Sequence, residues 1–82
     1  MAEEHIVEAH LPGIFYRRPS PEAEPYVNEG DTVGADDTIG LIEVMKSYHE
    51  VKAGIAGRVV EFMVENEGEI QPGEPLARVE KS

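Results

Sequence analysis

The chain has 82 residues and no cysteine, and its 17 acidic and seven basic residues give a formal charge of −10 at pH 7. This length allows one small domain with a modest core. The lack of cysteine excludes disulfides and Cys-ligated zinc. The acidic charge argues against binding to nucleic acid, which needs Lys and Arg to neutralise phosphates.

The charge also argues against attachment to an anionic membrane surface. No apolar run approaches the roughly 20 residues needed to span a bilayer. The acidic residues 1–5 lack the basic and apolar regions of a signal peptide. We therefore expect a soluble cytoplasmic protein, whose acidic surface either keeps it soluble or docks to basic patches on partners.

Short apolar segments alternate with glycine- or proline-containing turns along the whole chain. The segments rich in Ile, Val, Phe and Tyr are 5–9, 38–44, 48–53, 58–64 and 75–79. Such runs between turn signals predict β-strands. In one of them Val60, Phe62 and Val64 alternate with Glu61 and Met63, which predicts a half-buried strand. The fold class predicted is all-β, a small sandwich or flattened barrel.

An internal repeat divides the chain into two halves. Residues 28–33 return as 66–70, residues 39–43 return as 76–80, and residues 12–14 match 56–58. Chance recurrence of Glu, Gly and Asn in an acidic chain is the alternative interpretation. A true duplication predicts two interlocked halves related by a pseudo-twofold axis.

The first half is longer than the second. Gly13 and Gly30 are 17 positions apart, whereas Gly57 and Gly68 are 11 apart, so the first half carries about six extra residues. We place them in 15–26, whose three prolines remove backbone donors. This segment is therefore predicted to be an ordered protruding loop.

The motif Glu43-Val44-Met45-Lys46-Ser47 lies between two predicted strands and between the two halves. It predicts Lys46 at the tip of a tight hairpin, opposite the termini, flanked by half-exposed Val44 and Met45. A lysine amine in water is protonated at pH 7 and poorly nucleophilic. A dedicated ligase would therefore have to supply an activated acyl group, unless Lys46 is an ordinary turn residue.

Together these features resemble the biotinyl domain of the biotin carboxyl carrier proteins of acetyl-CoA carboxylase. The resemblance covers roughly residues 10–80 and includes the Glu-Xaa-Met-Lys motif that ends at Lys46. Its most specific part is Phe15-Tyr16-Arg17-Arg18-Pro19-Ser20-Pro21, which is similar to the protruding thumb of bacterial acetyl-CoA carboxylase carriers.

The resemblance implies that residues 1–82 form a single biotinyl domain. Its fold would be a flattened barrel of two four-stranded antiparallel sheets with pseudo-twofold symmetry, a thumb at about 16–26 and a biotin hairpin at about 43–48. Lys46 would carry biotin through an amide, within the attachment motif of Glu43, Val44, Met45 and Ser47. The thumb residues that would contact biotin are Tyr16, Arg17, Arg18, Pro19, Ser20 and Pro21.

The resemblance also implies partners and a reaction. A biotin protein ligase would attach the biotin, a biotin carboxylase would load it with carbon dioxide, and a carboxyltransferase would pass that group to an acyl-CoA. With acetyl-CoA the product is malonyl-CoA, for fatty acid synthesis. The chain itself would be a non-catalytic carrier, monomeric as an isolated domain.

Two departures from the family pattern are visible. The family usually has Glu-Ala-Met-Lys-Met, so Val44 and Ser47 could alter recognition by the ligase. The N-terminal region and Pro/Ala-rich linker of longer carriers are absent from this sequence, so docking to the carboxylase would differ.

Other functions remain open from the sequence. The chain could be a lipoyl carrier, although lipoyl domains usually have Asp-Lys at the hairpin. It could also serve a different biotin-dependent carboxylase, or be an unmodified interaction module with the same fold. An independent enzyme or metal site is disfavoured, because His5, His10 and His49 are scattered and no nucleophile motif occurs.

Overall fold

The computed structural model describes residues 3–81. Within that range the chain forms two four-stranded antiparallel sheets and no helix, so nothing there is a helix that could span a membrane. The strands are β1 (Glu4–Glu8), β2 (Gly13–Tyr16), β3 (Thr32–Val33), β4 (Thr38–Val44), β5 (Ser47–Lys52), β6 (Gly57–Phe62), β7 (Gly68–Ile70) and β8 (Pro75–Lys81). The two-sheet all-β prediction is confirmed.

The two sheets are built in the same way. Sheet A has the strand order β1-β8-β6-β3 and sheet B has the order β5-β4-β2-β7. Strands whose numbers differ by four occupy equivalent places, so β1, β8, β6 and β3 correspond to β5, β4, β2 and β7. The register agrees, because Val33 pairs with Gly57 in sheet A as Ile70 pairs with Gly13 in sheet B. The predicted repeat is thus a structural pseudo-symmetry.

A single apolar core fills the space between the sheets. Its largest fully buried side chains are Phe15, Ile39, Ile42, Val59, Ile70, Leu76 and Val79. Ile39 and Ile42 of β4 occupy the positions that Leu76 and Val79 occupy in β8, so both halves contribute equivalent residues. Burial of each large apolar side chain contributes about 1.5–3 kcal/mol. The core therefore fixes β4, which leads to the predicted attachment motif.

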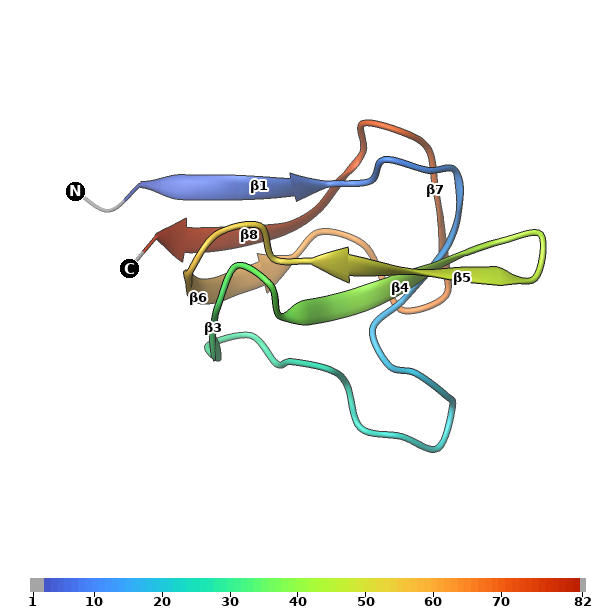
Figure 1. Cartoon of the computed structure of the whole chain (residues 1–82), viewed down its shortest axis with the longest axis horizontal. Coiled ribbons are helices and arrows are strands. Elements are labelled where there is room, and N and C mark those ends of the chain that lie inside the picture. Colours follow the sequence, from blue (N-terminus) through green and yellow to red (C-terminus); the bar gives the residue numbers. More distant parts are fainter. Residues whose placement is uncertain (1–2, 82) are drawn as a thin grey trace.

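Both termini lie at one end of the molecule, and the β4–β5 hairpin projects from the other (Figure 1). The segment between β2 and β3 protrudes sideways from the body of the sheets, which confirms a protruding loop. Its predicted start is wrong, both at about 16 for the thumb and at Phe15 for the range that holds the extra residues. Phe15 and Tyr16 belong to β2, and Phe15 is fully buried. The loop begins at Arg17.

The burial pattern predicted for residues 58–64 is also shifted. The register of β6 against β8 changes between Val59 and Glu61, which makes a β-bulge. Val59 is therefore fully buried and Val60 only half-buried, and the strand ends at Phe62. A bulge inserts one residue and reverses the alternation, which no local pattern reveals.

Gly57 allows the two central strands of sheet A, β6 and β8, to approach closely. It is buried, and a Cβ atom there would lie far inside van der Waals contact with the backbone carbonyl of Glu80. Gly13 has the same relation to the carbonyl of Glu43 in sheet B. Each sheet therefore requires a glycine at this crossing.

We predict that Gly57→Ala lowers the free energy of unfolding by about 1–3 kcal/mol, because the added methyl forces β6 away from β8. Gly34→Ala is the matched control, since the nearest atom to its Cβ would be Asp37 Oδ2 at 3.8 Å. Urea denaturation measures both. Equal midpoints for the two variants would contradict the steric argument.

Candidate functional site

Lys46 lies in a two-residue loop. Strands β4 and β5 pair as far as Val44 and Ser47, which leaves only Met45 and Lys46 to turn the chain. Both have positive φ angles, 49° and 68°, the sign pattern of a type I′ turn. Residues with a Cβ atom pay about 1–2 kcal/mol in this region, where Asn and Gly are favoured. The tip is thus strained, which points to side chains kept for function.

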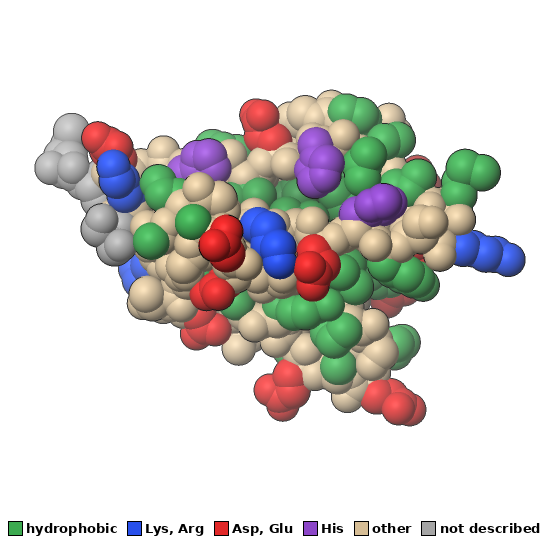
Figure 2. Space-filling model, viewed as in Figure 1, with side chains coloured by type: hydrophobic (Ala, Val, Ile, Leu, Met, Phe, Trp, Pro, Cys, Tyr) green, Lys and Arg blue, Asp and Glu red, His purple; other side chains and the backbone are tan. Residues whose placement is uncertain are grey.

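The tip presents its side chains to solvent. Lys46 and Ser47 are exposed, Met45 is 93% exposed, and Val44 is half-buried against the core. Half-exposure was expected for both Val44 and Met45, and it is wrong for Met45, which the tight loop points outward. A basic and an apolar side chain project from this end of the molecule in the space-filling view (Figure 2).

The amine of Lys46 is free of protein partners. Within residues 3–81 it makes no hydrogen bond or ion pair, whereas Lys52 pairs with Glu50 at 3.1 Å and Lys81 with Glu3 at 3.7 Å. The amines of Lys52 and Lys81 are thus ion-paired, whereas the amine of Lys46 is available at the tip.

The thumb, residues 17–26, is held together by its own backbone. The Tyr26 N–H donates to the Arg17 carbonyl at 2.9 Å and closes the base of the loop. Inside it, the Ala23 N–H donates to the Ser20 carbonyl at 3.1 Å, and Arg18 donates to the Ala23 carbonyl at 3.4 Å. The prediction of an ordered loop agrees with these contacts.

Arg17 fastens the thumb to the body of the domain. Its backbone N–H donates to Asn66 Oδ1 at 2.8 Å, and its guanidinium lies 4.1 Å from the centre of the Phe62 ring. Such a cation–π contact is stabilising. Arg17 therefore points away from the other predicted thumb residues and acts at the base of the loop.

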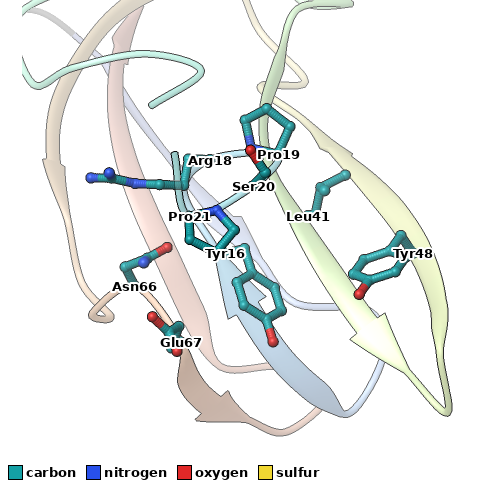
Figure 3. Close-up of a pocket in the computed structure, with 9 residues that line it drawn as sticks. All are labelled: Tyr16, Arg18, Pro19, Ser20, Pro21, Leu41, Tyr48, Asn66 and Glu67. Atoms are coloured by element: carbon teal, nitrogen blue, oxygen red, sulfur yellow. The ribbon is translucent and has the colours of Figure 1, made fainter. Parts of the chain in front are cut away.

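A pocket of about 230 Å³ lies between the thumb and sheet B (Figure 3). It is lined by Tyr16, Arg18, Pro19, Ser20, Pro21, Leu41, Tyr48, Asn66 and Glu67. The fold thus gathers five of the six predicted thumb residues and adds Tyr48, two positions after Lys46. Leu41, Tyr48, Asn66 and Glu67 were not predicted from the sequence. For Leu41 and Tyr48, an apolar residue on the outward side of a strand was the available signal.

Tyr16 connects the thumb base to the attachment motif. Its hydroxyl donates to Glu43 Oε1 at 2.8 Å, and its ring lies 6.4 Å from that of Tyr48. This hydrogen bond to a carboxylate raises the pKa of Tyr16 above its usual value of 10.0, because it stabilises the neutral phenol and the negative charge disfavours the phenolate. Two predicted site residues 27 positions apart are therefore in direct contact.

No metal centre accompanies this site in the part of the chain that the structure describes. There, no three side chains of His, Cys, Asp or Glu converge as ligands would.

A family model described as "Biotin-requiring enzyme" matches residues 7–79. The chain belongs to this family. Among relatives of the biotin-requiring family, it is 41% identical over 81 residues to the biotin carboxyl carrier protein of acetyl-CoA carboxylase from Chlamydia trachomatis, with 99% of this chain and 49% of that one covered. It is 42% identical over 79 residues to the protein of the same name from Streptococcus pyogenes, with coverage of 96% and 48%. The chain spans about half the length of these curated relatives.

Two solved structures of carboxylases contain the same fold. A single-chain, multi-domain long-chain acyl-CoA carboxylase matches with a TM-score of 0.80 and 24% identity, over 96% of this chain and 7% of that one. The urea carboxylase of Kluyveromyces lactis matches with a TM-score of 0.77 and 23% identity, over 94% and 6%. At these identities the likeness establishes the fold, which is that of the biotin-requiring family.

We predict that Lys46→Gly is more stable than Lys46→Ala by about 1 kcal/mol, because only glycine adopts the positive φ at the tip without strain. Both variants lack the amine, so the comparison isolates the backbone. Urea denaturation of the two variants measures the difference. Equal stability would show that the turn carries no strain.

Proposed function

We propose that this chain is a biotin carboxyl carrier of acetyl-CoA carboxylase type, with biotin attached through an amide to Lys46. The observation that carries the proposal is a free lysine amine on a two-residue tip, preceded by Glu43 and Met45 in the attachment pattern. Membership of the biotin-requiring family and the names of the relatives support it.

The chain's contribution to the chemistry is presentation. Packing of β4 in the core holds the hairpin, so an incoming enzyme meets the lysine in one geometry. A biotin protein ligase supplies biotin activated at its carboxyl group; the amine loses its proton, forms the amide and releases the activating group. Biotin held on Lys46 would supply the ureido nitrogen that carries carbon dioxide between a biotin carboxylase and a carboxyltransferase, with acetyl-CoA as the proposed acceptor and malonyl-CoA as the product.

The thumb pocket is the proposed contact surface for biotin when the arm folds back. On the thumb side it is lined by Tyr16, Arg18, Pro19, Ser20 and Pro21. An apolar wall with a few polar atoms is typical of small-molecule sites. Arg17 supports this wall through Phe62.

The proposal includes a non-catalytic, monomeric domain in the cytoplasm. Its partners are the ligase, the biotin carboxylase and the carboxyltransferase. The net charge of −10 disfavours self-association by repulsion.

Biotinylation is the direct test. Co-expression with the biotin ligase of the same organism should add the mass of one biotin, and streptavidin should detect it. Lys46→Arg, which keeps the charge but not the reactive amine, should abolish both signals. A biotin adduct that persists in this variant would disprove the site, and a lipoyl adduct on the wild-type chain would replace biotin as the cofactor.

A second prediction concerns the thumb. Because the Tyr26 N–H already donates to the Arg17 carbonyl, an Asn-Gly turn can replace residues 18–25 without moving the strands. Biotinylation should be retained, while the half-life of the carboxylated carrier in buffer should shorten, since the pocket wall is gone. Decay measured with labelled bicarbonate checks this, and an unchanged half-life would remove the thumb from biotin protection.

A further inference from the structure

The pseudo-symmetry allows the outer faces of the two sheets to be compared residue by residue. Ile14 pairs with Glu43 in sheet B as Arg58 pairs with Glu80 in sheet A. Tyr48 pairs with Glu43 as Glu4 pairs with Glu80. Each sheet therefore serves as an internal reference for the other.

The outer face of sheet A is tied together by ion pairs. Arg58 lies 3.6 Å from Glu80, and Arg78 lies 3.7 Å from Glu4 and 3.4 Å from Glu61. These partly exposed pairs span three neighbouring strands and leave few unmatched charges. Two arginines are thus paired with three glutamates within the domain itself.

Sheet B has apolar residues where sheet A has this network. Ile14 replaces Arg58, Leu41 replaces Arg78, and Tyr48 replaces Glu4. We call Ile14, Tyr16, Leu41 and Tyr48 the sheet-B face; Figure 3 shows the last three side by side along the pocket. Tyr48 is 60% exposed, although the fold does not demand an apolar residue there. The face continues towards Met45 at the tip.

Most carboxylates around this face lack an ion pair, the exception being Glu50, which lies opposite Leu41 and pairs with Lys52 at 3.1 Å. Glu43, Glu67 and Glu69 border it and make no ion pair within residues 3–81. Four of the seven basic residues are ion-paired: Lys52 with Glu50 on β5 of the same sheet, and Arg58, Arg78 and Lys81 on sheet A. The sheet-B face is therefore an apolar patch bordered by three carboxylates that make no ion pair within residues 3–81, with Arg18 at its thumb side.

We propose that the sheet-B face is a docking surface for a partner protein whose contact surface has an apolar centre bordered by lysine and arginine. Aromatic side chains such as Tyr48 are typical anchors of protein interfaces. Unpaired carboxylates attract a basic border and accelerate encounter. The inference rests on the proposed function, under which the partner is an enzyme that receives the biotinylated side chain of Lys46. Docking of the sheet-B face would set the direction in which that side chain enters the enzyme.

The test transfers the sheet A residues to sheet B. The variant Ile14→Arg/Leu41→Arg/Tyr48→Glu should fold, because the equivalent residues coexist in sheet A. Ile6→Arg, at a 37% exposed apolar position of sheet A, is the matched control. The purified ligase, biotin carboxylase and carboxyltransferase of the same organism are the probes, with carrier loading checked by mass.

For at least one enzyme, the KM for the triple variant should rise about tenfold or more. The control should behave as wild type, and the wild-type KM for that enzyme should rise with salt. An unchanged KM with all three enzymes overturns the proposal. If the circular dichroism of the triple variant shows that the β-sheets are lost, the single variant Tyr48→Glu is tested instead, with the same expected rise in KM.

Two other outcomes are distinguishable. A wild-type dimer in sedimentation equilibrium that the triple variant lacks would assign the face to a second copy of the chain and overturn the proposal. Absence of the biotin mass would instead overturn the proposed function. If the enzymes accept the loaded triple variant as well as the loaded wild type, the docking proposal is refuted and the proposed function stands.

Discussion

The register of β4 is the constraint on which the rest of the structure depends. Ile39 and Ile42 are fully buried, and this fixes which residues of β4 face the core and where its pairing with β5 ends. A slip of one residue would expose the buried set. Since pairing ends at Val44 and Ser47, Met45 and Lys46 must form the turn. The core thus holds a turn whose own residues disfavour it.

Functional features occur where the two halves differ. The strand orders of the sheets are equivalent, and their buried residues correspond. The thumb occurs only in the first half, and it stands over sheet B, whose outer face has exchanged ion pairs for Ile14, Leu41 and Tyr48. Glu43 illustrates the divergence, because it accepts from the Tyr16 hydroxyl whereas its counterpart Glu80 pairs with Arg58. The two halves share one frame and differ in the residues on their outer faces.

Much of the site could be predicted from local sequence. Turn glycines, short apolar segments and the repeat indicated an all-β duplicated domain, and the spacing around Lys46 indicated a hairpin tip. These features depend on residues close together in the sequence, so the local sequence pattern is enough to predict them. The thumb was located from the unequal spacing of the glycines, but its start at about 16 was too early, and the range given for the extra residues began inside β2 at Phe15. That ring is buried in the space that Gly40 leaves, where a Cβ atom would lie 2.6 Å from it.

The sequence by itself determined the longer strands, the duplication and the exposed lysine, because turn chemistry and alternation act over a few residues; the short strands β2, β3 and β7 were not predicted. Only the tertiary structure decided that Arg17 stacks on Phe62, that Tyr16 bonds to Glu43, and that the thumb meets Tyr48 across a pocket. Such contacts join residues far apart in the chain, and they depend on how the two sheets pack and where a bulge shifts the register. Local preference cannot encode that packing, since many side chains contribute to it at once.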